Sequence, residues 1–424
     1  MTTIMQTAKK IGPYGRAALG LILMLLLVDP VDNAHAQWVP KWLNVGELQS
    51  KYFSGGSSPE ADEVAWSYPG IEPRSAYSRW KGFWVSAKNV TDEDGRNWPV
   101  RISHIGPRSI GVGEVFDVSH VLSGRYEQPV VQVDGADTFA EPVVVDEVNA
   151  AQAPDRMVTS IINTSIGVTM ERKAMQWSHP DHDNYHIIEY TFTNTGNVDR
   201  DDQIEVESND LEDVYFTFLD RPTGAGAFAG AWDNSAGGVA WGEDTMNDAV
   251  GDGVSDYGVD FRAQFSWLAN LKESHGVPFN TLGNPMWRNH QWNGLADDTL
   301  GRLGSPNFSG VVTIHADTEA HAPEASSPDD PAQPRTMTYL NSDFGDMTSG
   351  SDHNNEPKMG RERTWIECGS SETPSGGIAS IDGGDCNTPR TYPTHARLVM
   401  GQTASTPRDQ IPDYATQTAD VRRG

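Results

Sequence analysis

The densest set of metal-ligand side chains in the sequence is His179-Pro-Asp-His-Asp-Asn-Tyr-His186. Histidine and aspartate are ligands for zinc and related metals, so one candidate metal site comprises His179, His182, Asp183 and His186. The spacing is neither HExxH nor that of the metallo-β-lactamase-like hydrolases. The alternative is that His179 and His182 are exposed loop residues and that His186, on a strand, is a hydrogen-bonded histidine of the core.

A second set, His315-Ala-Asp-Thr-Glu-Ala-His321, has a ligand-type side chain at every other position. If a strand beginning near Val311 continued through it, these four side chains would share one face of the sheet. Pro and Ser residues follow directly and indicate that the strand ends earlier. Exposed loop residues are therefore the alternative to a metal site here as well.

An acidic, glycine-containing stretch at residues 244–256 is the best candidate for calcium. Calcium takes about six to eight oxygen ligands on a loop that can bend, and the candidate ligands are Asp244, Asn247, Asp248, Asp252 and Asp256. The spacing is not that of an EF-hand loop, so a solvated acidic loop is the alternative. Asp199, Asp201 and Asp202 form a weaker acidic candidate.

The chain contains 13 tryptophans, and exposed aromatic rings beside carboxylates suit glycan binding or glycoside hydrolysis. The glycan candidates in Gly- and Asn-rich segments are Trp232, Trp241, Trp287 and Trp292. No carboxylate pair for hydrolysis can be selected from the sequence. There is no G-x-S-x-G, P-loop, CxxC or dinucleotide fingerprint, so nothing supports a serine hydrolase, a nucleotide-dependent enzyme or a redox enzyme.

The element expected to organise these residues is a strand within Asn184–Asn197. His186, Ile188, Tyr190 and Phe192 alternate with more polar residues, which is the period-two pattern of a half-buried strand. The segment from Gly167 to Trp177 has strand character too. The two segments are therefore predicted to form a hairpin across residues 178–183.

Short apolar runs recur between turn residues along most of the chain, and helical periodicity is absent. The sequence therefore predicts an all-β protein of two packed β-sandwich-like modules with long acidic loops. The modules would span residues 37–165 and 166–400, and the tail 401–424 would be disordered. Residues 316–363 have little apolar content and are expected to lie over the surface.

Residues 1–36 have the pattern of a signal peptide. A basic region with Lys9, Lys10 and Arg16 precedes the apolar run Ala17–Val28, and Ala34-His-Ala36 is a cleavage site. The predicted location is secreted, cell-surface or periplasmic, with no membrane span after cleavage. The formal charge of −28 disfavours nucleic acid and anionic lipid as partners. Calcium is the only cofactor expected.

The two cysteines, Cys368 and Cys386, are expected to form a disulfide, because an exported chain passes through an oxidising compartment. They flank a segment rich in Gly, Ser and Asp. Without a CxxC pair, zinc or redox chemistry at these cysteines is disfavoured.

The order of several segments resembles a group of large exported bacterial proteins of unknown function, many of which end in a secretion-sorting domain. The segments are 46–55, 66–70, 82–87, 185–197 and 213–218, and the Thr191–Gly196 segment is similar to strand ends of bacterial immunoglobulin-like adhesion domains. The resemblance covers about half of the chain and supplies no catalytic residue. No sorting module is recognisable before Gly424, which leaves open a truncated chain or a different mode of retention.

These observations lead to two hypotheses of different classes. The first is a non-enzymatic secreted or cell-surface protein with a structural or adhesive role, stiffened by calcium. The second is a protein that binds or cleaves glycans through its loop tryptophans. Extracellular glycans and other surface proteins are the partners that these hypotheses imply.

Overall fold

The computed structural model describes residues 39–56, 66–68, 76–105, 114–128, 132–137, 143–222, 245–250, 262–268, 309–322, 325, 327–330 and 354–368. The predicted signal peptide, residues 1–36, and the tail, residues 401–424, lie outside these ranges. None of the described helices is long and apolar enough to cross a membrane.

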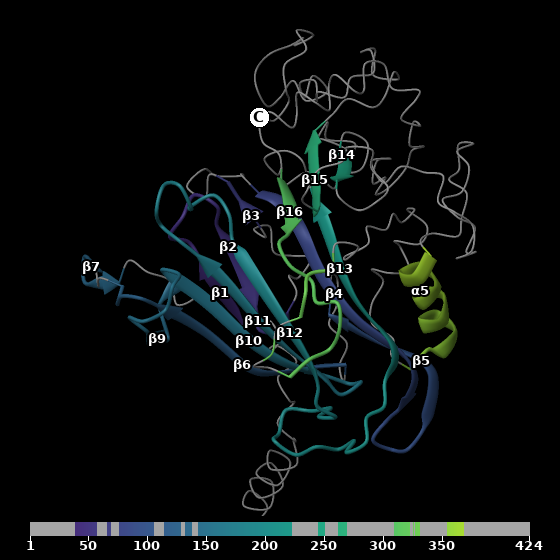
Figure 1. Cartoon of the computed structure of the whole chain (residues 1–424). Helices are drawn as coiled ribbons and strands as arrows, with labels where there is room; N and C mark the ends of the chain where they lie inside the picture. The colour runs from purple at the N-terminus through teal and green to yellow at the C-terminus, as the bar shows by residue number, and fades with distance from the viewer. Residues whose placement is uncertain are drawn as a thin grey trace, which may run out of the picture.

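A five-stranded sheet is the larger layer of the fold (Figure 1). Its order is β12 (Ile187–Asn194), β11 (Val168–Gln176), β10 (Arg156–Thr164), β6 (Val115–Gly124) and β9 (Glu147–Val148). Neighbouring strands are antiparallel except β6 and β9, which are parallel. The hairpin predicted around residues 178–183 is confirmed as β11 and β12, and β12 forms the edge of the sheet.

The second layer is built around the long strand β4 (Ala76–Thr91). It pairs on one side with β13 (Glu212–Pro222) and on the other with β3 (Trp66–Ser67) and β5 (Asn97–Ile105). Three small antiparallel sheets are β1 (Pro40–Leu43) with β2 (Ser50–Phe53), β7 (Gln132–Val133) with β8 (Ala136–Asp137), and β14 (Thr245–Val250), β15 (Arg262–Leu268) and β16 (Ser309–Thr313). The predicted all-β class is confirmed.

The main hydrophobic core lies between the two large sheets. Phe83 and Ile105 are cross-strand partners in β4 and β5, and they share a core cluster with Ile162 and Met170 of the five-stranded sheet. All four side chains are at most 2% exposed. The two sheets therefore pack face to face around apolar side chains that alternate along each strand.

The period-two pattern predicted for β12 is confirmed. Tyr190 and Phe192 are half-buried and pack against the main core, whereas Glu189, Thr191 and Thr193 are exposed. The apolar side chains of this edge strand therefore face the second sheet.

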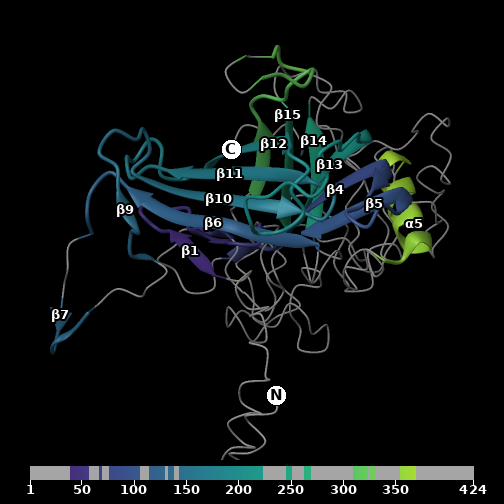
Figure 2. The same cartoon turned by 90° about the horizontal axis from the view of Figure 1, so that it is seen from below.

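The expectation that residues 316–363 only cover the surface is wrong for their last part, because a helix, α5 (Glu356–Cys368), begins there. The Asn355 side chain caps it: its Oδ1 accepts the backbone N–H of Lys358 at 3.1 Å. The helix lies against β5 on the side away from the five-stranded sheet (Figure 2). The fold thus has a third layer over β4 and β5.

Strands on both sides of the expected module boundary at residues 165 and 166 share one sheet. β10 ends at Thr164 and pairs antiparallel with β11, which begins at Val168. The main core likewise combines residues from before and after the boundary, such as Trp98 and Met170. Side chains from both sides are therefore packed into the same core.

Candidate functional site

The most concentrated set of buried ionisable groups lies between α5 and the sheet beneath it. Trp84 and His104 are cross-strand partners in β4 and β5, so both side chains project from the same face. Their rings meet edge to face at 4.8 Å between centroids. Glu362 of α5 contacts this face beside His104, and Glu114 reaches it from the residue before β6.

His104 is held between two carboxylates. Its Nδ1 lies 2.8 Å from Oε2 of Glu114, and its Nε2 lies 2.8 Å from Oε2 of Glu362. The same oxygen of Glu114 also accepts the backbone N–H of His104 at 2.7 Å. An imidazole that donates from both nitrogens is an imidazolium, so this geometry favours the cationic form of His104.

The charges of this cluster balance. Lys358, one turn before Glu362 on α5, places Nζ 3.8 Å from the other carboxylate oxygen, Oε1. One imidazolium and one ammonium therefore compensate two carboxylates, as buried charges require. Burial opposes the charged form of His104, but hydrogen bonds to Glu114 and Glu362 outweigh it and raise the pKa of His104 to about 9.

A carboxylate–imidazole–carboxylate row can relay protons in an active site, but burial gives this one a different role. Glu114 and Glu362 are 0% exposed and His104 is 2% exposed. Both imidazole nitrogens are already occupied by carboxylates that belong to separate elements. In this state the group joins α5, β5 and the start of β6, and its three side chains are buried.

A second histidine, the half-buried His120 of β6, has the opposite environment. Its Nδ1 lies 3.0 Å from Oγ of Ser160 and its Nε2 lies 3.2 Å from the backbone oxygen of Tyr52. Burial, followed by the nearby Arg172 guanidinium, lowers the pKa of His120 to about 3. His120 is thus neutral over the whole physiological range, and it links β2 to the five-stranded sheet.

The structure brings part of the histidine-rich candidate together: the rings of His179 and His182 lie 5.7 Å apart between centroids, whereas His186 bonds to other residues. His179 and His182 are exposed in the loop between β11 and β12, and His182 Nδ1 lies 2.6 Å from the Tyr185 hydroxyl. His186 accepts from the Tyr52 hydroxyl at Nδ1, at 2.9 Å, and donates from Nε2 to the backbone oxygen of Leu48, also at 2.9 Å. This is the hydrogen-bonded histidine that the sequence offered as the alternative.

Among the described residues, one group of three acidic side chains converges in a way that suits a cation: Asp199, Asp201 and Glu205, with one carboxylate oxygen of each within 4.8 Å of the others. The sequence singled out two of the three. Several of these oxygens accept local backbone N–H groups, for example Asp201 Oδ1 from Gln203 and Glu205 Oε2 from Val198. Such bonds also satisfy an acidic loop that holds no ion.

The calcium candidate at 244–256 is described only in part. Asn247 and Asp248 are consecutive residues of β14, paired with β15. Asp244, Asp252 and Asp256 lie outside the described residues, as do Trp232, Trp241, Trp287 and Trp292. Cys368 is the last residue of α5, and Cys386 lies outside the described residues. The disulfide therefore stays a prediction.

Sequence reasoning missed the Glu114–His104–Glu362 group altogether. His104 and Glu362 are 258 positions apart, so no spacing motif joins them. The available signal was local: His104 interrupts the apolar run of β5 at a position that strand alternation buries. A buried histidine requires a partner, but the sequence does not say which carboxylate supplies it.

Comparison with known proteins found no matching family model, and no curated protein and no solved structure is significantly similar to this chain.

Proposed function

We propose that this chain is a secreted or cell-surface protein with a non-enzymatic, structural or adhesive role. The observation that carries the proposal is the state of its Glu114–His104–Glu362 group. These side chains have the composition of an acid–base site, yet they are sealed between layers and join three elements. Buried ion pairs that join the layers oppose their separation, which suits a protein that must stay folded outside the cell.

An aromatic cluster at the edge of the two sheets supports an adhesive role. Phe83, Tyr190, Phe192, Phe216 and Phe218 form it, with the rings of Phe192 and Phe216 stacked at 3.9 Å between centroids. Its two members on β13 are well exposed, Phe216 at 39% and Phe218 at 49%. Large exposed aromatic side chains supply contact area at a low entropic cost.

Calcium is the cation we propose as a stiffener of this protein, at the 244–256 segment that its composition favours. The Asp199–Asp201–Glu205 group is the second acidic position with suitable donors. Both belong to a chain with a formal charge of −28, which attracts divalent cations and gains stability when they neutralise repelling carboxylates.

The test of the proposal has an activity arm and an adhesion arm. Residues 37–424 should release no reducing ends from a broad polysaccharide panel beyond the level of the heat-denatured protein. The same protein should adsorb to surfaces coated with extracellular matrix protein or polysaccharide. Substitution of Phe216 and Phe218 by serine should weaken adsorption, whereas serine at Val311 and Val312, which are exposed residues of β16, should not.

Turnover of any polysaccharide would contradict a non-enzymatic role, above all if Asp201→Asn with Glu205→Gln abolished it in a folded protein. Equal adsorption by the wild type and both serine variants would remove the aromatic cluster as the adhesive surface.

Glycan binding is the second candidate function, and the exposed rings of Phe216 and Phe218 favour it because sugars stack on aromatic side chains. A glycan array probed with residues 37–424, followed by calorimetric titration of each hit, tests it. Loss of binding in the Phe216/Phe218 variant would place the site on β13. Binding that survives in that variant would place it at the loop tryptophans, and a flat array would exclude this function.

A further inference from the structure

The described residues 315–322, 325 and 327–330 follow β16, and they bring two stretches of this segment side by side. The strand ends at Thr313, and the chain folds back so that Asp317 and Asp329 pair in an isolated antiparallel bridge. The backbone N–H of Asp330 donates to the Ala316 oxygen at 2.7 Å. The buried hydroxyl of Ser327 accepts the N–H of Thr318 at 2.9 Å, which fixes the segment that carries the histidines.

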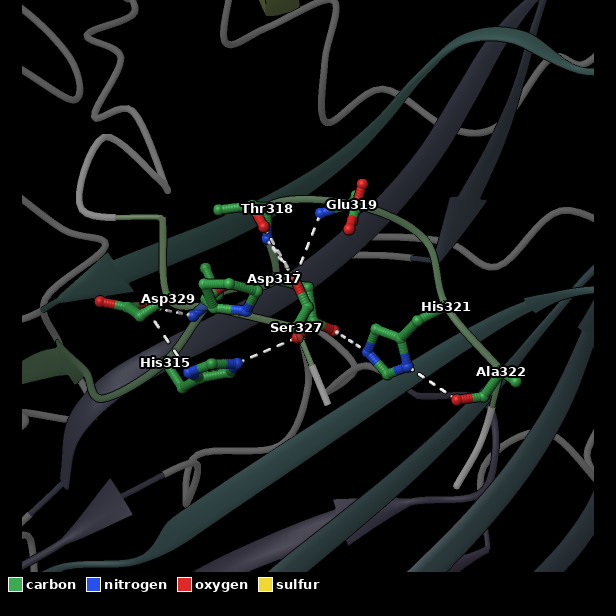
Figure 3. Close-up of polar contacts among 10 residues, drawn as sticks. His315, Asp317, Thr318, Glu319, His321, Ala322, Ser327 and Asp329 are labelled. Carbon is green, nitrogen blue, oxygen red and sulfur yellow. Dashed lines mark hydrogen bonds and ion pairs between the residues drawn. The ribbon is translucent and has the colours of Figure 1, made fainter. Parts of the chain in front are cut away.

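This folding brings two histidines and two aspartates together (Figure 3). Oδ1 of Asp317 lies 2.9 Å from Nε2 of His315, and Oδ2 of Asp317 lies 3.1 Å from Nε2 of His321. Asp329 Oδ1 lies 3.8 Å from Nδ1 of His315. Glu319, the fourth member of the sequence pattern, points away from the imidazoles in Figure 3.

The tautomer of His321 indicates that a proton or a metal ion lies between its Nε2 and Asp317. Its Nδ1 donates to the backbone oxygen of Ala322 at 2.8 Å, so a neutral His321 has a lone pair at Nε2. That lone pair faces a carboxylate oxygen of Asp317 at 3.1 Å. Two acceptors at this distance repel each other unless a proton or a metal ion lies with them. An Nδ1–H bond to a backbone carbonyl is also the contact that orients metal-binding histidines.

We propose that His315, Asp317 and His321 bind a divalent transition metal ion of the zinc type, with Asp329 on the other nitrogen of His315, where it would orient the ring. Two neutral imidazoles and two carboxylates carry a charge of −2, which one such ion balances. Imidazole nitrogen and carboxylate oxygen are the donors that zinc accepts, whereas calcium and magnesium prefer oxygen alone.

The side chains have the freedom that binding requires. Asp317 now lies between the two imidazoles, so it must rotate for both nitrogens to reach one ion at about 2.0–2.1 Å. The side chains of His315 and Asp317 are 50% and 49% exposed, so Asp317 can rotate, and the ion would replace its contacts to the two imidazoles. Two hydrogen bonds hold the two stretches in place while Asp317 rotates: Thr318 N–H to Ser327 Oγ and Asp330 N–H to the Ala316 oxygen.

The experiment titrates untagged residues 37–424, stripped with EDTA, with Zn²⁺ at pH 7.5 by calorimetry. We expect one zinc ion per chain at this site, and a Co²⁺-loaded sample should show the visible absorption of a four-coordinate nitrogen and oxygen site. His315→Ala with His321→Ala should weaken binding by about tenfold or more, and Asp317→Asn should weaken it less. Excess Ca²⁺ should not displace the ion.

The matched control is His179→Ala with His182→Ala, which removes the other exposed histidine pair and should leave zinc affinity unchanged. Loss of zinc binding in that control with retention in the His315/His321 variant would overturn the proposal. So would the absence of Zn²⁺ binding by the wild type, which would mean that protons alone separate the acceptors of His321 and Asp317.

Discussion

At the scale of single residues, the stability of the described core depends on how its buried charges are paired. His104 is cationic because Glu114 and Glu362 bind both of its nitrogens, and it is desolvated almost completely. Removing any one member leaves the others buried without compensation, which costs more than the intact group contributes. Stability should therefore respond sharply to pH and to substitution here.

Alkaline pH should destabilise the protein through His104. Its folded-state pKa, about 9, lies above the unfolded value of 6.5, so the folded state holds the proton more tightly. The contribution is complete below pH 6.5 and is lost as the pH rises through 9, and it amounts to about 3 kcal/mol. Urea unfolding between pH 7 and 9.5, followed by tryptophan fluorescence, measures it.

His104→Gln should flatten this pH dependence, because it removes the titrating group. His120 should contribute nothing to it, since His120 stays neutral across that range. A slope that is the same in the wild type and in His104→Gln would show that other groups cause it.

Glu362→Ala should destabilise the fold by about 3–5 kcal/mol, because His104 and Lys358 would then be left with too little negative charge in a buried site. Glu356→Ala is the control on the same helix: Glu356 is exposed and lies 4.0 Å from Arg96, so it should cost at most about 1 kcal/mol. Denaturant unfolding of both variants measures the difference. Equal losses would mean that Glu362 is not the anchor of α5.

At the scale of elements, α5 illustrates a helix whose buried face is partly charged. Among the residues of α5 whose side chains the structure describes, the buried ones are Lys358, Met359, Glu362, Arg363 and Ile366, at helical spacing but with three charged members. The Arg363 guanidinium donates to the Ser86 hydroxyl at 2.9 Å. Charged residues at buried positions weaken the apolar periodicity by which a helix is recognised in a sequence.

Gly360 lowers the stability of this helix, and alanine can replace it without a steric clash. A methyl group there would have no atom within 4 Å, and alanine favours the helix by about 0.5–1 kcal/mol over glycine. Gly360→Ala should raise the free energy of unfolding by about that amount in denaturant titration.

Gly196→Ala should have the opposite effect and lower the free energy of unfolding. Gly196 has φ +74° and a methyl group there would collide with the backbone oxygen of Val206, so alanine should destabilise the turn after β12 by more than about 1 kcal/mol. Stabilisation by this second substitution would contradict the packing described for the turn.

At the scale of the whole molecule, two sheets and a helix are combined with a surface of high negative charge. Its 59 acidic residues outnumber the 31 lysines and arginines, so electrostatic repulsion opposes the compact state and bound cations should relieve it.

Calcium should accordingly raise the thermal stability of residues 37–424 after treatment with EDTA. A ligand that binds only the folded state adds about 2.7 kcal/mol at one hundred times its dissociation constant. Differential scanning calorimetry should show this rise in the wild type and in Asp201→Asn with Glu205→Gln, and lose it in Asp248→Ala with Asp252→Ala. The reverse pattern would assign calcium to the Asp199–Asp201–Glu205 group, and no rise would leave the acidity without a role in cation binding.

Local sequence patterns are enough to predict the strand class and much of the strand placement. The alternation in β12, its hairpin with β11 and the strands that include Gly82–Ala87 and Asp213–Leu219 follow from period-two burial, which is a local property. The same alternation offered a hydrogen-bonded core histidine as the alternative to a metal ligand at His186, which in the structure is hydrogen-bonded and half-buried.

Which residues of different segments meet depends on tertiary packing. Glu114, His104 and Glu362 form one group because two sheets and a helix stack, and Asp329 joins His315 because a loop folds back. Burial patterns repeat along a strand and can be read locally. The pairing of charges depends on three-dimensional packing between separate segments, whether 10 positions apart, as for His104 and Glu114, or 258 apart, as for His104 and Glu362, and the local sequence does not show which segments meet.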